Sequence, residues 1–399
     1  MSVSISRRGQ LLPASAIRKL IPYADLAKSN GKKVLHLNIG QPDIPTPPAF
    51  WDAVRSYSES VLAYSPSTGM SVFIDALQEY YAAWNLEFAP ADLIATFGGS
   101  EALIMAMMIV GDPGDQIIIP EPFYTNYLCF ARMAAVDVTP VVTDVRDGYR
   151  LPPYEELRKL VTPKTRAIIV NTPNNPTGHV VSREEMAAVA KLALEHDLFV
   201  ISDEVYREFI FDGEQHVSPM DFPELRDRVI LVDSISKVFS SCGARVGCIA
   251  SKNKQVMNSA LRIAQGRLCV PTLEQIAAAA AYRARTEYLP PVVKEYQVRR
   301  DIVWEGLQGI SGVRCPRASG AFYSQTELPV DNAEKFIIWM LTSFDVDGVT
   351  VMLAPGDGFY ATPGTGGREA RIAYVLEGPK LRQAINILKN GLEVYRELL

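Results

Sequence analysis

Apolar runs of strand length recur through the middle of the chain, and segments with helical spacing separate most of them. The runs lie at 93–97, 116–119, 136–142, 167–171, 198–202, 229–233 and 246–250. Helical patterns at 100–110, 182–196 and 252–265 lie between several of these runs. Because the runs have no polar face, they are typical of strands covered on both sides. The alternation therefore predicts an α/β three-layer sandwich around a mostly parallel seven-stranded sheet.

The pattern changes near residue 285. Helical segments at 292–309, 332–344 and 378–397 dominate from there, with short strands expected near 313, 321–325, 349–353 and 371–375. Ahead of the sheet lie a helix at 16–30, a strand at 34–38 and helices at 47–60 and 70–85. We therefore predict a large domain over 46–287 and a smaller α+β domain over 288–399. The N-terminal segment 1–45 is expected to pack with the smaller domain, because the sheet begins only around residue 92.

One segment, 354–369, is rich in glycine and proline. These residues favour turns and irregular backbone over helix or strand. The segment is either a mobile lid over a site or a long surface connection, and the sequence supports both interpretations equally.

Composition narrows the functional classes. The 399-residue chain carries a net charge of −5, without the lysine and arginine clusters that mark nucleic-acid binding. No apolar run is long enough to cross a bilayer. The five cysteines show no CxxC spacing, so we expect free thiols in a reducing compartment, the cytoplasm. The four histidines are widely spread, which argues against a metal site or a Ser-His-Asp triad.

Several polar motifs directly follow the expected strands. In parallel α/β sheets, ligands bind at the carboxyl ends of the strands. Segment 98–101 (Gly-Gly-Ser-Glu) opens a helix, whose N-terminal amides can bind phosphate, although a plain helix cap at Ser100 explains it as well. The proline-rich loop 171–178 either aims an asparagine amide at a ligand or is an ordinary turn.

Two further motifs suggest a specific cofactor. Asp203, at a strand end, is suited to keeping a pyridine nitrogen protonated, and Tyr206 is suited to donating to a phenolic oxygen of the same ring. Lys237 can form a Schiff base with an aldehyde, and the serines around it and Arg245 are donors for a phosphate. Taken singly, each of these residues has an ordinary structural explanation: a helix cap, a core tyrosine or a surface lysine.

Together, and in this order on successive strands, the motifs resemble the fold-type I pyridoxal-phosphate enzymes of the class I/II aminotransferase family. The chain is similar to aspartate, alanine and aromatic aminotransferases over nearly its whole length, from Leu37-Asn38-Ile39-Gly40-Gln41-Pro42-Asp43 to Arg371-Ile372-Ala373. The resemblance implies transfer of an amino group from an L-amino acid to a 2-oxo acid by a ping-pong mechanism. A pyridoxal-phosphate lyase that breaks a β or γ bond is the alternative on the same fold.

The resemblance also implies roles for individual residues. Lys237 would carry the cofactor as an internal aldimine and then move the substrate proton, while Asp203 pairs with the ring nitrogen. Asn175 and Tyr206 would bind the phenolic oxygen, and Tyr124 would stack on the ring. The phosphate contacts implied are Gly99, Ser100, Ser234, Ser236 and Arg245, with Tyr64 reaching the phosphate of the other subunit of a homodimer. Gly40, Asn175 and Arg371 would contact the substrate, with Arg371 gripping its α-carboxylate.

The resemblance leaves the substrate side chain open. Dicarboxylate-specific enzymes of the family need a second cation, for which Arg267 and, more weakly, Arg18 are candidates. Arg267 precedes segment 268–272, which in the family lies near the active site of the partner subunit. A surface role for Arg267 is equally compatible with the sequence. A non-enzymatic binding module is disfavoured, because Lys237 is intact.

Overall fold

A seven-stranded sheet forms the centre of the computed structural model, which describes residues 3–399. Its strand order is β2-β8-β7-β6-β5-β3-β4. The strands are β2 (Leu93–Thr96), β3 (Gln116–Glu121), β4 (Asp137–Val142), β5 (Thr165–Asn171), β6 (Phe199–Asp203), β7 (Val229–Ser234) and β8 (Gly247–Ala250). Only β8 runs antiparallel to its neighbours within this sheet. The predicted α/β class with a mostly parallel seven-stranded sheet is therefore confirmed.

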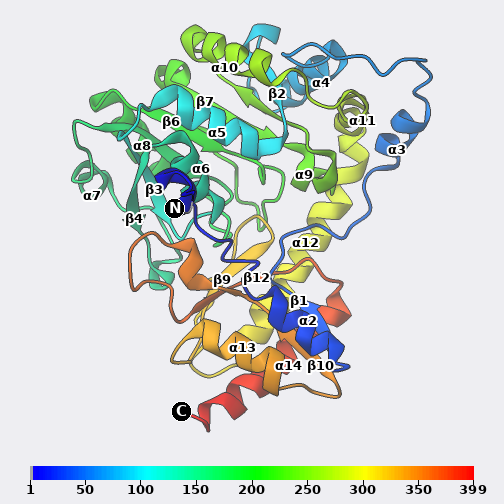
Figure 1. Ribbon diagram of the computed structural model, residues 1–399, viewed down its shortest axis with the longest axis vertical. Helices are drawn as coiled ribbons and strands as arrows, with labels where there is room; N and C mark the ends of the chain where they lie inside the picture. The colour runs from blue at the N-terminus through cyan, green and yellow to red at the C-terminus, as the bar shows by residue number, and fades with distance from the viewer. Residues whose placement is uncertain (1–2) are drawn as a thin grey trace.

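Helices cover both faces of this sheet (Figure 1). One face packs against α5 (Gly98–Val110), α6 (Asn126–Ala134) and α10 (Lys254–Arg267). The other packs against α4 (Ser71–Ala82), α8 (Arg183–Glu195) and α11 (Thr272–Arg283). Within β3, Ile117 and Ile119 join the first core and Ile118 the second. This alternation explains the continuous apolar runs, because both faces of each strand are buried.

The lower part of the molecule in Figure 1 contains two smaller sheets. β1 (Lys33–His36) pairs in parallel with β10 (Val349–Met352), and β12 (Glu369–Ala373) lies between β11 (Ala354–Pro355) and β9 (Tyr323–Glu327). The helices there are α2 (Ile21–Ser29), α13 (Ala333–Ser343) and α14 (Gly378–Arg396), with the long α12 (Arg285–Gln308) leading in from the seven-stranded sheet. Residues from 20–37 and 292–395 share one apolar core, so the two ends of the chain pack together.

Several elements differ from the sequence predictions. The first long helix begins at Ile21 rather than 16, with Pro22 in its first turn, a position where proline needs no amide partner. The expected strand near 313 is only an isolated bridge between Arg314 and Glu327. Helices α6 and α11 were not predicted, and α11 is alanine-rich and buried on several sides, so its spacing carries little pattern. The remaining short helices are α1 (Arg7–Gln10), α3 (Pro48–Arg55), α7 (Tyr154–Arg158) and α9 (Ile235–Val238).

The glycine- and proline-rich segment 354–369 packs against the end of β3. Phe359 is fully buried, and its carbonyl accepts a hydrogen bond from the Phe123 amide at 2.9 Å. Glu121 Oε2 accepts from the amides of Ala361 (2.7 Å) and Thr362 (3.2 Å). The first half of the segment is thus tied to the large sheet by its own backbone. Among residues 3–399, no helix is both long and apolar enough to span a membrane.

Candidate active site

A cavity of about 390 Å³ opens at the carboxyl ends of β5, β6 and β7, where they meet β12 and the segment after β1. Almost every residue singled out from the sequence lines it. Those residues are Gly40, Gly99, Ser100, Tyr124, Asn175, Asp203, Tyr206, Ser234, Ser236, Lys237, Arg245 and Arg371. Tyr64, which is 81% exposed, and Arg267 do not line this cavity. The fold therefore brings together residues from seven separate stretches of sequence.

Lys237 reaches into this cavity from α9, the short helix that follows β7. Its Nζ donates to the carbonyl of Gly40 at 2.8 Å and lies 3.8 Å from Cys242 Sγ. Burial by itself lowers the pKa of Lys237, but the neighbouring Tyr323, Cys242 and Tyr124 outweigh burial and raise it above the ordinary value. The amine thus stands at the junction between the large sheet and the segment that carries Gly40.

Asp203 ends β6 and points its carboxylate into the cavity, although only 4% of the residue is exposed. Burial raises its pKa to about 6, and a 2.6 Å hydrogen bond from the Tyr127 hydroxyl opposes this rise. Among the described residues, no arginine or lysine forms an ion pair with this carboxylate. A buried carboxylate without a cationic partner is suited to bind a cationic group of a ligand.

The N-terminus of α5 and the loop before β8 form a cradle of donors. Arg245 Nη2 donates to the Phe97 carbonyl at 3.2 Å, beside Gly98. A Cβ on Gly98 would come within 2.6 Å of that nitrogen, and the φ of +70° also favours glycine. The hydroxyls of Ser234 and Ser236 lie 2.7 Å apart on the same side of the cavity. Helix amides, hydroxyls and a guanidinium together suit a phosphate.

Arg371, on β12, is a fully buried cation. Its Nη1 donates to Asn175 Oδ1 at 2.9 Å and its Nη2 to the Asn38 carbonyl at 2.6 Å, while Nε has no partner. The guanidinium forms no ion pair with any carboxylate of residues 3–399, and burial lowers its pKa. A buried guanidinium held only by neutral oxygens, with an unpartnered N–H, is suited to bind an anion in the cavity.

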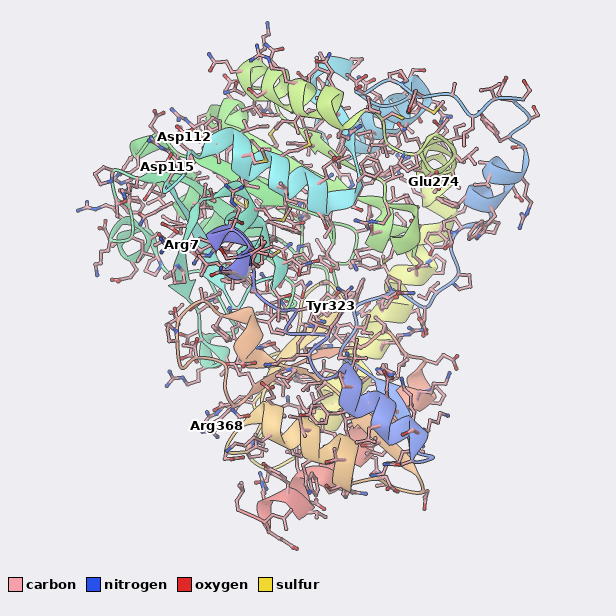
Figure 2. All side chains as sticks on the ribbon, in the orientation of Figure 1. Arg7, Asp112, Asp115, Glu274, Tyr323 and Arg368 are labelled. Carbon is pink, nitrogen blue, oxygen red and sulfur yellow. The ribbon has the colours of Figure 1, made fainter. Side chains whose placement is uncertain are left out.

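Tyr323 is a cavity residue that the sequence analysis missed. Its hydroxyl lies 2.9 Å from that of Tyr206, and its ring lies 4.6 Å from the Arg371 guanidinium carbon. A Cβ at position 40 would collide with this tyrosine, so Gly40 permits the close approach. Tyr323 begins β9, on the side of the smaller sheets that faces the large sheet (Figure 2). The only sequence signal for it was a short expected strand at 321–325.

Arg267 and Arg18, the two candidate cations for a substrate side chain, have different surroundings in the structure. Arg267 donates to Glu101 Oε2, to the Leu268 carbonyl and to the Ala95 carbonyl, and it does not line the cavity. Arg18 does line the cavity, next to Ser15, and its guanidinium has no hydrogen-bond or ion-pair partner within residues 3–399. Arg18, the weaker candidate from the sequence, is therefore the one of the two that lines the cavity of its own chain.

Comparison with known proteins decides the family. The family model "Aminotransferase class I and II" matches residues 32–372. The chain belongs to the class I and II aminotransferase family. It is 30% identical to a probable aspartate aminotransferase of Methanocaldococcus jannaschii, over 98% of this chain and 100% of the relative. It is also 30% identical to aromatic-amino-acid aminotransferase 2 of Thermococcus litoralis, over 98% and 99%.

The structure agrees with this assignment. The aspartate aminotransferase of Thermus thermophilus, solved with maleate, superposes with a TM-score of 0.89 at 28% identity, over 98% of this chain and all of that one. This member of the family is therefore a pyridoxal-phosphate-dependent aminotransferase, which transfers an amino group from an amino acid to a 2-oxo acid. Nothing in these comparisons favours the lyase alternative.

Pyridoxal phosphate fits the groups that line this cavity. The cradle of α5 amides, serine hydroxyls and Arg245 suits the phosphate, and the unpaired Asp203 carboxylate suits a protonated ring nitrogen. The Lys237 amine suits the aldehyde carbon. No group of histidine, cysteine, aspartate or glutamate within residues 3–399 has the arrangement of a metal site.

Proposed function

We propose that Arg371 binds the α-carboxylate of the amino-acid substrate. One observation carries this assignment: a fully buried guanidinium in the cavity has an unpartnered Nε and no carboxylate partner in the described chain. Asn175 and Asn38 hold its two terminal nitrogens, so the planar group is oriented before the substrate arrives. A fixed fork suits a carboxylate, which it can bind through two parallel hydrogen bonds.

Lys237 and Asp203 are proposed to serve the chemical step. When bound, pyridoxal phosphate supplies an aldehyde for amine exchange and a conjugated ring that withdraws the electron pair left at the substrate Cα. The Lys237 amine would then be the base that takes up and passes on the proton released from the substrate Cα. Asp203 keeps its negative charge against the ring nitrogen, and Tyr127 orients that carboxylate by a 2.6 Å hydrogen bond.

The remaining lining residues are proposed to hold the ring in place. Asn175 and Tyr206, whose polar atoms lie 3.5 Å apart, would hydrogen-bond the phenolic oxygen, and Tyr124 would hold the ring from one side. The phosphate is bound by Gly99 and Ser100 at the start of α5. It is also bound by Ser234, Ser236 and Arg245. Gly40 borders the substrate through its backbone.

The amino donor is proposed to be a dicarboxylic amino acid such as aspartate. Arg18 supports this, because it is a cation on the cavity wall without a partner in residues 3–399 and so can receive a side-chain carboxylate. Relatives named aspartate aminotransferases, and the Thermus thermophilus enzyme solved with maleate, also support it. An aromatic donor would instead use the apolar wall formed by Ile17, Ile39 and Leu103.

We also propose a homodimer in which Tyr64 reaches the phosphate of the partner's cofactor. Tyr64 is 81% exposed, and Val61 (70%), Leu62 (61%) and Leu268 (52%) are exposed near it. Residues 61–64, Cys269 and residues 271–274 line one open hollow of the surface, and Figure 2 marks its member Glu274 in the first turn of α11. Exposed apolar side chains grouped in this way are typical of a subunit interface.

We also propose the domain boundaries and the cellular compartment of the protein. Residues 46–287 would form a large cofactor-binding domain and 288–399 a small domain, with 1–45 packed on the small one, as the core shared by residues 20–37 and 292–395 supports. The protein would work in the cytoplasm, where its five unpaired cysteines stay reduced.

The proposed reaction is tested by the visible absorbance of the purified protein loaded with pyridoxal phosphate. A single amino acid should bleach the cofactor band, and a 2-oxo acid should restore it. The amino acid that works at the lowest concentration identifies the donor. A band that persists while pyruvate or ammonia accumulates without any 2-oxo acid would contradict transamination and favour the lyase.

A further inference from the structure

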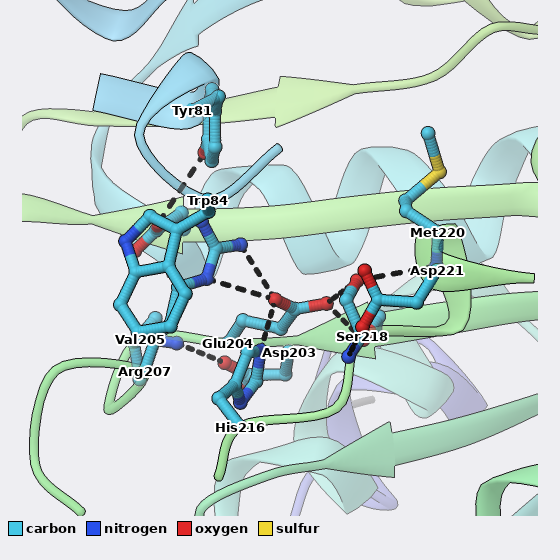
Figure 3. Close-up of polar contacts among 12 residues, drawn as sticks. Tyr81, Trp84, Asp203, Glu204, Val205, Arg207, His216, Ser218, Met220 and Asp221 are labelled. Carbon is cyan, nitrogen blue, oxygen red and sulfur yellow. Dashed lines mark hydrogen bonds and ion pairs between the residues drawn. The ribbon is translucent and has the colours of Figure 1, made fainter. Parts of the chain in front are cut away.

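A buried group of charges surrounds Glu204, the residue after Asp203 (Figure 3). Its centre is Glu204, which is fully buried and accepts five hydrogen bonds. The donors are Ser202 Oγ (2.7 Å), Ser218 Oγ (2.7 Å), His216 Nε2 (2.7 Å), Arg207 Nε (3.0 Å) and Arg207 Nη2 (2.5 Å). None of these five donors comes from the cavity wall.

The residues on either side of Glu204 face the cofactor cavity, whereas Glu204 itself does not. Asp203, Val205 and Tyr206 all line the cavity, whereas Glu204 and Arg207 do not. The turn that presents the Asp203 carboxylate and the Tyr206 hydroxyl is therefore closed from behind by the Glu204–Arg207 ion pair. The backbone adds to this closure, because the Arg207 amide donates to the Glu204 carbonyl at 2.9 Å and the Glu204 amide donates to Val232 of β7 at 2.9 Å.

The same charge cluster extends to the strand that leads to Lys237. Asp233, near the end of β7, is 3% exposed, and its Oδ1 accepts from the Ser234 amide at 2.7 Å. Its Oδ2 accepts from the Tyr81 hydroxyl at 3.3 Å, and the Arg207 guanidinium lies over the Tyr81 ring at 4.9 Å. Ser234 in turn lines the cavity three residues before Lys237.

The charges of the cluster act on one another across the strand ends. The titratable groups that face it are Asp203 and Glu204 after β6, Arg207, Glu208 and His216 on the following loop, Asp233 and Cys248 on β7 and β8, and Tyr80, Tyr81 and Tyr282 on α4 and α11. Burial raises the pKa of Asp233 to about 7, and Arg207 opposes this rise. The negative charge of Glu204 also contributes to the raised pKa of Asp203.

We propose that Glu204 and Arg207 are positioning residues for the aminotransferase reaction. Their ion pair holds the 203–206 turn in register with the cofactor cavity, and the balance of their two charges sets the electrostatic potential at Asp203 and Lys237. This inference rests on the proposed roles of Asp203 and Lys237. Neither residue touches the cofactor or the substrate, so both act only through the turn and the field behind it.

The test is a pH titration of the visible absorbance of the loaded holoenzyme, compared among wild type, Glu204→Gln and Arg207→Gln. Glu204→Gln leaves the Arg207 charge unbalanced and should lower the pH midpoint of the spectral change, by about half a pH unit for charges separated by protein interior. Arg207→Gln leaves the negative charge of Glu204 unbalanced and should raise the pH midpoint of the spectral change. Both variants should lower kcat roughly tenfold or more, with a smaller effect on KM, because the turn is misplaced.

A core variant separates this proposal from a merely structural role. Leu192→Ala removes a fully buried side chain of α8 from the apolar core that also contains Tyr81. It should lower the stability of the protein without moving the pH midpoint of the spectral change. Unchanged midpoints in both charge variants, or shifts in the same direction, would overturn the proposal. Absence of a cofactor band in the wild type would instead refute the proposed cofactor roles themselves.

A further variant covers failure of a single variant to fold. The double variant Glu204→Gln/Arg207→Gln removes both members of the buried ion pair together, so it leaves neither Glu204 nor Arg207 buried without its partner. If it folds, the proposal predicts weaker binding of pyridoxal phosphate, measured by fluorescence titration, and a kcat lowered roughly tenfold or more. Wild-type cofactor affinity and kcat in the folded double variant would overturn the proposal.

Discussion

Replacing Arg371 by lysine tests the proposed binding of the substrate carboxylate. Lysine keeps the charge but not the planar fork, so one of two charge-assisted hydrogen bonds to the carboxylate is lost. Arg371 is 1% exposed, and the exchange also removes the bonds that orient it on Asn175 and the Asn38 carbonyl. A charge-assisted hydrogen bond contributes about 1.5–3 kcal/mol, which corresponds to roughly a 10- to 150-fold lower kcat/KM for aspartate.

The assay compares two amine substrates, so that loss of the carboxylate contact is separated from general damage. Aspartate carries the α-carboxylate, and β-alanine is the same molecule without it. The spectral change of the loaded enzyme is followed with each substrate, for wild type and Arg371→Lys. The variant should lose its activity mainly toward aspartate, because β-alanine cannot use the fork. An equal loss toward both amines would refute the assignment of Arg371.

Three further predictions follow from the site. Because burial raises the pKa of Asp203 to about 6 from 3.8, this carboxyl stabilises the apoprotein at low pH and that stability is lost as pH rises through 4 to 6. In urea unfolding, the Asp203→Asn apoprotein should gain up to about 3 kcal/mol over wild type at pH 8 and little at pH 4, and a pH-independent difference would contradict this. Arg18→Ala should lower kcat/KM for aspartate by up to about fivefold and leave alanine unaffected, as expected for loss of one exposed ion pair to substrate. Arg267→Ala is the matched control and should leave the ratio of the two substrates unchanged. Lys237→Ala and Tyr64→Ala proteins, each impaired alone, should regain activity when refolded together, because one site of the mixed dimer then has both residues. No gain on mixing would contradict the placement of Tyr64 in the partner's site.

The sequence predicted the sheet and most of the cavity wall because both follow local patterns. Each buried strand is a continuous apolar run, and Asp203, Asn175 and Ser234 lie within or just beyond such runs. The order of these motifs along the chain was enough to group residues that lie far apart in sequence. Helix α11 escaped prediction because its alanines are buried on several sides and give no periodic contrast.

Other parts of the site depend on contacts that no local pattern records. Tyr323 and Tyr127 are single aromatic residues whose roles follow from what they face: the Tyr206 hydroxyl and the Asp203 carboxylate, respectively. The sequence could not show the surroundings of Arg18 and Arg267, because the partners of a guanidinium are visible only in the fold, where Glu101 engages Arg267. The Glu204 cluster joins the 202–207 segment to residues far from it in the sequence, such as Tyr81 and Asp233, so no local pattern reveals it.

The central claim is that Lys237 holds pyridoxal phosphate, and reduction with sodium borohydride tests it most directly. Reduction makes the bond between the cofactor and its lysine permanent, and peptide mass spectrometry then identifies that lysine. The account predicts one phosphopyridoxyl group per chain, on the peptide that contains Lys237, and none when the protein is first treated with aspartate to release the lysine. A label on another lysine, or no label at all, would contradict the account.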